Sequence, residues 1–134
     1  MLPPVVAAAW LEANAADVVI ADVRWYPDGR SGRDTYAAGH LPGAVFVDLE
    51  HSLSGPAGDR GRHPLPDPER FAESMSGLGI GEHDTVIGYD DQGGVMAARL
   101  VWMLRVTGHP AALLDGGLAA WTAPLTTVER PRPA

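Results

Sequence analysis

The part of the chain that most constrains its fold is residues 85–99, where a short apolar run leads through a glycine-containing loop into an apolar helix. Residues 86–89 are predicted to form a buried strand, and residues 95–107 form the strongest predicted helix. A strand that turns into a helix in this way points several backbone N–H groups and the positive end of the helix at one place. The pattern predicts a pocket for an anion or an ionised nucleophile.

Asp90 is the residue that leaves this strand, and the chain contains no cysteine. Because a nest of N–H donors at a helix start activates a thiolate, the chain has the architecture of a reactive loop without its most plausible nucleophile. The residues expected to form the loop and its anion nest around position 90 are Asp91, Gln92, Gly93, Gly94, Val95, Met96 and Arg99. The lack of cysteine also excludes disulfides and thiolate metal sites.

The composition fits one globular domain. The 134 residues, 46% apolar and 20% charged, suffice for a single core. No apolar run approaches the roughly 20 residues that cross a bilayer, and the N-terminus lacks the basic segment of a secretory signal. We therefore expect a cytoplasmic location and no membrane contact.

The charge pattern limits the expected partners. All ten basic residues are arginines, and the formal net charge is −7. An acidic chain repels phosphate backbones, so nucleic acid is not an expected partner, and lysine chemistry is excluded. We expect no cofactor. A small anion remains a candidate partner because five arginines gather in the first half of the chain: Arg24, Arg30, Arg33, Arg60 and Arg62.

Short apolar runs alternate with helical segments along the chain. The predicted strands are residues 18–21, 44–47, 86–89 and 111–114, and the predicted helical segments are residues 5–14, 34–38, 67–79, 95–107 and 118–121. This alternation is typical of an α/β fold with a parallel sheet and helices on both faces. Ligands of such folds bind at the carboxyl ends of the strands, where Asp22, Asp90 and Asp115 are expected.

Two segments depart from this pattern. Residues 48–66 form a long irregular segment, and segments of this length are often functional. Its Arg60, Arg62 and His63 either clamp an anion or are solvated loop charges, and the sequence favours neither interpretation. The proline-rich residues 123–134 are predicted to be a linker, which leaves residues 1–122 as the folded domain.

Residues 36–44 form a predicted tight junction between a helical turn and a strand. Gly39 and Gly43 allow positive φ angles there, and Pro42 rigidifies the turn. His40 lies inside the junction. A lone histidine in a turn, with no visible partner, is more often a structural hydrogen-bonding group than a general base, and we favour the structural role.

Acidic residues near the strand ends have both structural and functional interpretations. Asp22 is expected to accept loop N–H groups, or to pair with Arg24 or Arg33, rather than to act in catalysis. The adjacent Asp90 and Asp91 suggest a magnesium site, but neighbours on an extended segment point to opposite sides. We therefore expect no metal site.

The last predicted strand is followed by a glycine-rich turn. Asp115 precedes Gly116 and Gly117, which predict a close approach of backbone to backbone. Trp102 and Trp121 are most simply core residues.

Taken together, these motifs resemble a rhodanese domain. They follow the family's order and cover about residues 5–121: Asp22-Val23-Arg24, Tyr36-x-x-x-His40-Leu41-Pro42-Gly43-Ala44 and Asp115-Gly116-Gly117-Leu118-x-x-Trp121. The resemblance implies a parallel α/β three-layer sandwich. It also implies the family's chemistry, in which a loop cysteine takes sulfane sulfur from thiosulfate and passes it to cyanide or another thiophile.

Finer features are similar to the N-terminal half of two-domain thiosulfate sulfurtransferases: His63-Pro64-Leu65-Pro66, the helix over residues 71–80, and residues 89–102. In that group the C-terminal domain carries the reactive cysteine, and the N-terminal domain often has aspartate at the matching place. The resemblance implies that Asp90 occupies the nucleophile position and that this chain is inactive by itself. Its role would be structural or regulatory, and its partner a catalytic rhodanese domain.

Two other functions remain open. A stand-alone module without catalysis would bind a small anion or a protein through residues 48–66. A metal-dependent hydrolytic site at Asp90 and Asp91 is the least favoured hypothesis.

Overall fold

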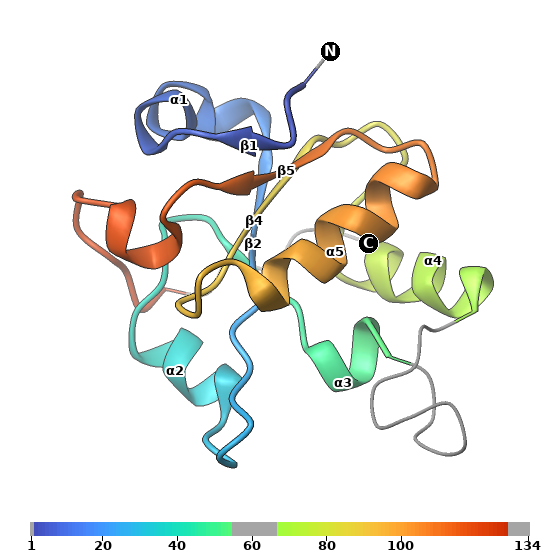
Figure 1. Ribbon diagram of the computed structural model, residues 1–134, viewed down its shortest axis with the longest axis horizontal. Helices are drawn as coiled ribbons and strands as arrows, with labels where there is room; N and C mark the ends of the chain where they lie inside the picture. The colour runs from blue at the N-terminus through green and yellow to red at the C-terminus, as the bar shows by residue number, and fades with distance from the viewer. Residues whose placement is uncertain (1, 55–66, 129–134) are drawn as a thin grey trace.

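A parallel sheet forms the centre of the computed structural model, which describes residues 2–54 and 67–128 (Figure 1). In this part of the chain the sheet has five strands in the order β1-β5-β4-β2-β3. The strands are β1 (Val5–Val6), β2 (Val19–Asp22), β3 (Val45–Phe46), β4 (Val86–Tyr89) and β5 (Ala111–Leu114). All pairs are parallel, as the alternating pattern predicts.

Helices cover both faces of the sheet. They are α1 (Ala8–Asn14), α2 (Gly32–Ala38), α3 (Leu49–Ser52), α4 (Pro68–Gly77) and α5 (Val95–Val106), with 3₁₀ turns η1 (Ala15–Asp17) and η2 (Gly117–Ala120). One core cluster joins the sheet to α3, α4 and α5, and a second joins it to α1, α2 and η2. Successive residues of β2 serve opposite clusters, as in Val19 and Ile20. The predicted three-layer α/β sandwich is confirmed.

The strand order places the candidate site. The chain passes from β2 to β3 on one side and then returns to form β4 on the other side of β2. The carboxyl ends of β2 and β4 therefore meet where the direction of strand addition reverses, and Asp22 pairs in register with Tyr89. Ligands of open α/β sheets bind in the crevice at such a point.

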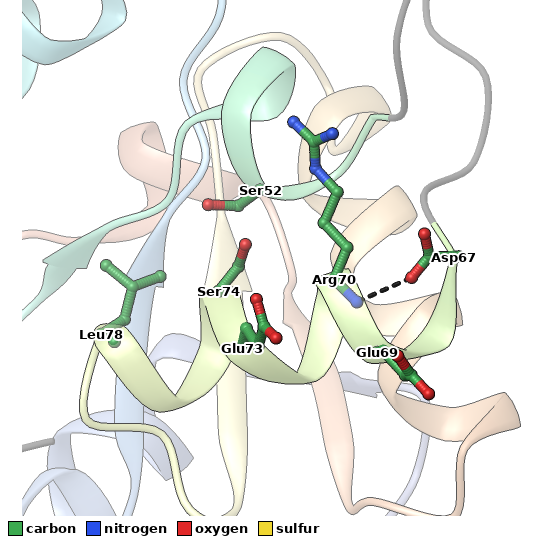
Figure 2. A pocket seen from close by; sticks show the side chains of 8 residues that line it. Ser52, Asp67, Glu69, Arg70, Glu73, Ser74 and Leu78 are labelled. Atoms are coloured by element: carbon green, nitrogen blue, oxygen red, sulfur yellow. Dashed lines mark hydrogen bonds between the residues drawn. The ribbon is translucent and has the colours of Figure 1, made fainter.

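Helix α4 begins at Pro68, directly after the capping residue Asp67, as the sequence predicts. The Asp67 side chain accepts a hydrogen bond of 2.8 Å from the backbone N–H of Arg70, which caps the helix. Figure 2 shows this bond. Pro68 follows at the first helical position, where its missing N–H costs no hydrogen bond.

The predicted helix over residues 5–14 is wrong at its start. Val5 and Val6 form β1, which pairs with Leu113 and Leu114 of β5. The edge of β5 offers free backbone groups, and two β-branched residues fit such an edge strand. Hydrogen bonds from a distant strand therefore decide this conformation, and the helix begins only at Ala8.

Residues 48–66 are not irregular throughout. Leu49–Ser52 form the short helix α3, whose start is stabilised by a 2.9 Å hydrogen bond from the Glu50 N–H to the Asp48 carboxylate. Leu49 and Leu53 are buried in the core beside α4. Arg60, Arg62 and His63 lie outside the described residues, so the anion clamp stays a prediction.

The first part of the predicted linker lies on the domain. Thr126 forms an antiparallel bridge with His40, with hydrogen bonds of 2.9 and 3.0 Å in the two directions. The described chain up to Val128 therefore continues the fold beyond the predicted boundary at residue 122.

Candidate functional site

The Asp90 carboxylate is completely buried, and it accepts four backbone hydrogen bonds from the loop that follows it. Oδ1 accepts from Gln92 and Gly94, both at 2.9 Å. Oδ2 accepts from Met96 at 2.9 Å and Ala97 at 2.8 Å. Each oxygen thus accepts hydrogen bonds from two N–H groups. The carboxylate occupies a nest of backbone amides, which is a known kind of anion-binding site.

The sequence of the loop explains why these N–H groups converge. Gly93 and Gly94 have φ angles of +75° and +89°, a region that favours glycine, and they turn the chain back toward the end of β4. α5 then begins at Val95. Met96 and Ala97 lie in its first turn, where N–H groups have no partner within the helix.

The donors overlap with the predicted loop residues but do not match them fully. Gln92, Gly94 and Met96 were expected near position 90, whereas Ala97 was missed. The signal that could have found Ala97 is its place in the first helical turn. Val95 is 66% exposed and donates no hydrogen bond to Asp90 among those described for this carboxylate.

Asp91 and Gln92 fasten the loop to the segment after β2. The Tyr26 hydroxyl donates to Asp91 at 2.6 Å, and the Gln92 side-chain amide donates to the carbonyl of Trp25 at 2.9 Å. Burial, followed by the hydrogen bond to Asp91, raises the pKa of Tyr26. Asp90 and Asp91 are therefore engaged by different groups, which does not favour a shared metal site.

Arg99 lies beside the nest rather than among its hydrogen-bond donors. Its Nε donates to the carbonyl of Leu53 at 2.8 Å, and partial burial lowers the pKa of its guanidinium. The side chain lines a hollow of about 380 Å³ whose other walls include Trp25, Met96 and Trp102. Trp102 is 53% exposed, so its predicted place in the core is wrong.

A second buried carboxylate, Asp22, ends the neighbouring strand β2. Arg24 donates to it through Nε at 3.0 and 3.1 Å and through a terminal nitrogen at 2.7 Å, and the Tyr89 hydroxyl donates at 2.6 Å. Burial alone would lower the pKa of Arg24, but the bond and charge of Asp22 raise it. Burial, together with Asp22, raises the pKa of Tyr89. These contacts favour the structural interpretation of Asp22.

His40 joins the α2–β3 junction to the end of the described chain. It is fully buried, and its Nδ1 lies 2.7 Å from the carbonyl oxygen of Tyr36 and its Nε2 2.9 Å from that of Val128. Its ring stacks on Tyr36 at 3.9 Å. These contacts favour the structural role over that of a general base. Gly43 has the expected positive φ of +82°, whereas Gly39 is extended.

The turn after β5 touches the backbone of Asp90. The Leu118 N–H donates to the Asp90 carbonyl at 3.0 Å. A Cβ at Gly117, whose φ is +59°, would lie 2.5 Å from that carbonyl oxygen. The close backbone approach predicted for Gly116 and Gly117 is therefore a contact between this turn and the backbone of Asp90. Asp115, which precedes the turn, is exposed.

A larger hollow, of about 720 Å³, lies between α3 and α4 (Figure 2). Charged residues dominate its lining, with Asp67, Glu69 and Glu73 beside Arg70. Its lining residues belong to α3, to α4 or to the residues next to α4, and none of them belongs to the loop that surrounds Asp90. The nest at β4 is therefore the better candidate site.

Within residues 2–54 and 67–128, no three histidine, aspartate or glutamate side chains gather in a way that suits a metal ion. In the same residues, no helix is long and apolar enough to span a bilayer.

Comparison with known proteins places this geometry in a family. The rhodanese-like domain family matches residues 6–124. The chain belongs to the rhodanese family. The thiosulfate/3-mercaptopyruvate sulfurtransferase 2 of Arabidopsis thaliana is 42% identical over 125 residues, which are 90% of this chain and 36% of that protein. The probable 3-mercaptopyruvate sulfurtransferase of Pseudomonas aeruginosa is 44% identical over 112 residues, 80% of this chain and 39% of that protein.

Solved structures agree with this membership. The 3-mercaptopyruvate sulfurtransferase of Leishmania major has a TM-score of 0.88 and 29% identity, and the match covers 97% of this chain and 38% of that one. The chain thus spans well under half the length of these relatives.

Proposed function

We propose that this rhodanese-like domain is the non-catalytic N-terminal half of a sulfurtransferase, in which a cysteine of a second domain carries the transferred sulfur. The observation that carries the proposal is the filled nest. An amide nest of the kind that would hold a thiolate contains the Asp90 carboxylate, and the chain has no cysteine.

The chemistry of sulfane sulfur transfer supports an inactive role. Transfer needs a nucleophile that forms a bond to sulfur and releases it again, and a carboxylate oxygen is a poor sulfur acceptor. Asp90 would also repel an anionic donor. At about 4 Å each pair of like charges costs roughly 1 kcal/mol in water and about 4 kcal/mol near a protein surface, and a dianion such as thiosulfate doubles this cost.

The relatives extend the range of donors beyond thiosulfate. Their names include both thiosulfate and 3-mercaptopyruvate. We propose a small anionic sulfur donor for the complete protein, with thiosulfate and 3-mercaptopyruvate as the two candidates.

The direct test is sulfur transfer by the isolated chain. We expect no thiocyanate from thiosulfate and cyanide, and no pyruvate from 3-mercaptopyruvate with a thiol acceptor, above the buffer control. Turnover by the isolated chain would contradict the proposal. The positive control is the complete reading frame of the gene, for which we expect a second rhodanese-like domain with a loop cysteine and measurable transfer.

A second variant tests the loop itself. Asp90→Cys places a thiol among the four donors, but we expect at most weak transfer, because the loop fits around a carboxylate with both oxygens bonded. Asp90→Ala is the matched control without a nucleophile. Robust activity of Asp90→Cys would show that the loop is competent for sulfur transfer and that only the nucleophile is missing.

A further inference from the structure

The hollow of about 720 Å³ between α3 and α4 is separate from the Asp90 nest. Arg70, Ser74 and Leu78 line it along one side of α4, and Leu78 directly follows the last helical residue (Figure 2). They are four positions apart, and a helix with about 3.6 residues per turn brings such positions to the same side. We refer to these three residues as the α4 row. A cation, a hydroxyl and an apolar group thus follow one another along the hollow.

Ser52 of α3 lies across the hollow from the α4 row (Figure 2). It is only 4% exposed, yet within the described residues its hydroxyl forms no hydrogen bond. Leaving a buried hydroxyl without a partner costs free energy. In the same part of the chain, the guanidinium of Arg70 and the hydroxyl of Ser74 also have no partner. These three polar groups are therefore available to a ligand in the hollow.

Gly77 leaves room at the end of the hollow where Leu78 lies. It lines the hollow, and a Cβ added to it would have no heavy atom within 4 Å. Small-molecule sites have volumes of roughly 300–1,000 Å³, and the hollow falls within this range. It therefore has space for the apolar side chain of a small ligand beside Leu78.

The charges on the lining favour a ligand that carries both signs. Glu73 is exposed and follows Arg70 by three positions, which puts their Cβ atoms about 5–6 Å apart. Among the described residues, neither side chain forms an ion pair. A simple anion would be repelled by the carboxylates of Asp67, Glu69 and Glu73, which also line the hollow. A simple cation would be repelled by Arg70 and would leave its guanidinium unpaired. A zwitterion satisfies both signs.

We propose that the hollow between α3 and α4 binds a free α-amino acid with an apolar side chain. The guanidinium of Arg70 donates to the α-carboxylate, for which its planar fork is suited, and the carboxylate of Glu73 accepts from the α-ammonium group. The hydroxyls of Ser52 and Ser74 donate to the remaining lone pairs of the ligand carboxylate. The ligand side chain lies against Leu78. This inference goes beyond the proposed function and does not depend on it.

The test is a titration of the chain with L-leucine, followed by the NMR shifts of the backbone amides. We expect saturating shifts in residues 49–52 and 67–78, with a dissociation constant of about 1 mM, because so small a ligand makes few contacts. Isocaproate is leucine without the ammonium group, and isoamylamine is leucine without the carboxylate. Each of these matched probes should bind about tenfold more weakly, because it leaves one charged group of the site without a partner.

Three substitutions separate the charges of the site from its shape. Arg70→Gln and Glu73→Gln should each weaken the binding of L-leucine about tenfold. Gly77→Leu fills the hollow without changing a charge and should abolish binding, while the open space around this position lets the domain fold. Arg30→Gln and Glu82→Gln are the matched controls, because they remove exposed charges outside the hollow and should leave binding unchanged.

Unfolding midpoints close to that of the unchanged chain show that the variants fold. Shifts that do not saturate with L-leucine, or that arise away from α3 and α4, would overturn the proposal. Isocaproate binding as tightly as leucine would replace it with a simple anion site, and isoamylamine binding as tightly would replace it with a simple cation site. Undiminished binding by Gly77→Leu would show that the ligand lies outside the hollow. Because none of these measurements depends on sulfur transfer, their failure leaves the proposed function untouched.

Discussion

Two buried carboxylates at the ends of neighbouring strands are stabilised in opposite ways. Asp90, after β4, receives four backbone N–H bonds from residues 92–97. Asp22, at the end of β2, receives its bonds from the side chains of Arg24 and Tyr89, and from the backbone of Arg24. Neither carboxylate is accessible to solvent.

The surroundings of Asp90 have the geometry of an anion-binding site, whereas those of Asp22 hold neighbouring elements of the fold together. The nest around Asp90 is made of backbone N–H groups, so a substitution at position 90 removes no donor, and the nest would suit other anions. The Asp22 cluster depends on particular side chains. Arg24 also donates to the carbonyl of Gly39 at 2.6 Å, and Tyr89 accepts from the N–H of Leu41, so the cluster ties β2 and β4 to the α2–β3 junction.

The largest effect is expected from breaking the side-chain cluster. Asp22→Ala leaves the guanidinium of Arg24 buried without its carboxylate, and losing one partner of a buried ion pair costs about 3–5 kcal/mol. Urea unfolding measures this loss. The matched control is Asp28→Ala, which removes an equally spaced but exposed ion pair with Arg30 and should leave the unfolding midpoint nearly unchanged. Equal losses in the two variants would contradict the scaffold role.

Removing the other carboxylate should open the nest. Asp90→Ala leaves four N–H groups without their acceptor, and we expect a loss of about 2–4 kcal/mol, since water can satisfy part of the loop. Sodium formate supplies a free carboxylate and should raise the melting temperature of Asp90→Ala, because it binds the folded state. The unchanged chain should not respond relative to sodium chloride at the same ionic strength. The same response in both proteins would show that formate acts elsewhere.

A substitution outside the loop tests how closely the turn after β5 packs against the backbone of Asp90. Gly117→Ala places a Cβ 2.5 Å from the Asp90 carbonyl oxygen. Together with the positive φ at this position it should cost about 2–3 kcal/mol. Gly29→Ala is the control, because Gly29 also has a positive φ but no atom near the added Cβ, and it should cost only about 1 kcal/mol. Indistinguishable unfolding midpoints would mean that the turn shifts freely away from Asp90.

The smallest effect is expected from the hydrogen bond between Tyr26 and Asp91, which holds the loop after β4 to the segment after β2. The pKa of Tyr26 is raised by burial and by its bond to Asp91. A tyrosine whose pKa is higher in the folded than in the unfolded state contributes stability that is complete below about pH 10 and is lost as the pH rises further. Urea unfolding between about pH 8 and 11 should therefore show a steeper alkaline loss in the unchanged chain than in Tyr26→Phe. Parallel curves would exclude a contribution from this hydroxyl.

Predictions succeeded where the decisive partners are close in sequence. The cap at Asp67 bonds Arg70, and three of the N–H groups that bond Asp90, those of Gln92, Gly94 and Met96, lie within six residues of it, so spacing and residue type suffice. The prediction of a helix at Val5 and Val6 failed because their partners, Leu113 and Leu114, lie more than one hundred positions away. Trp102 was assigned to the core because an apolar residue alone does not reveal which side of a helix faces the sheet.

The alternation of strands β2 to β5 with helices, the loop of N–H donors after β4 and the lack of a thiol follow from the sequence alone, because each depends on residue type and local spacing. Tertiary structure decided which side chains neutralise Asp22, how His40 holds the segment up to Val128, and which side of α5 is left in water. These features bring together residues that the chain separates widely or orient whole elements, and only the packing of the sheet and its helices determines such arrangements.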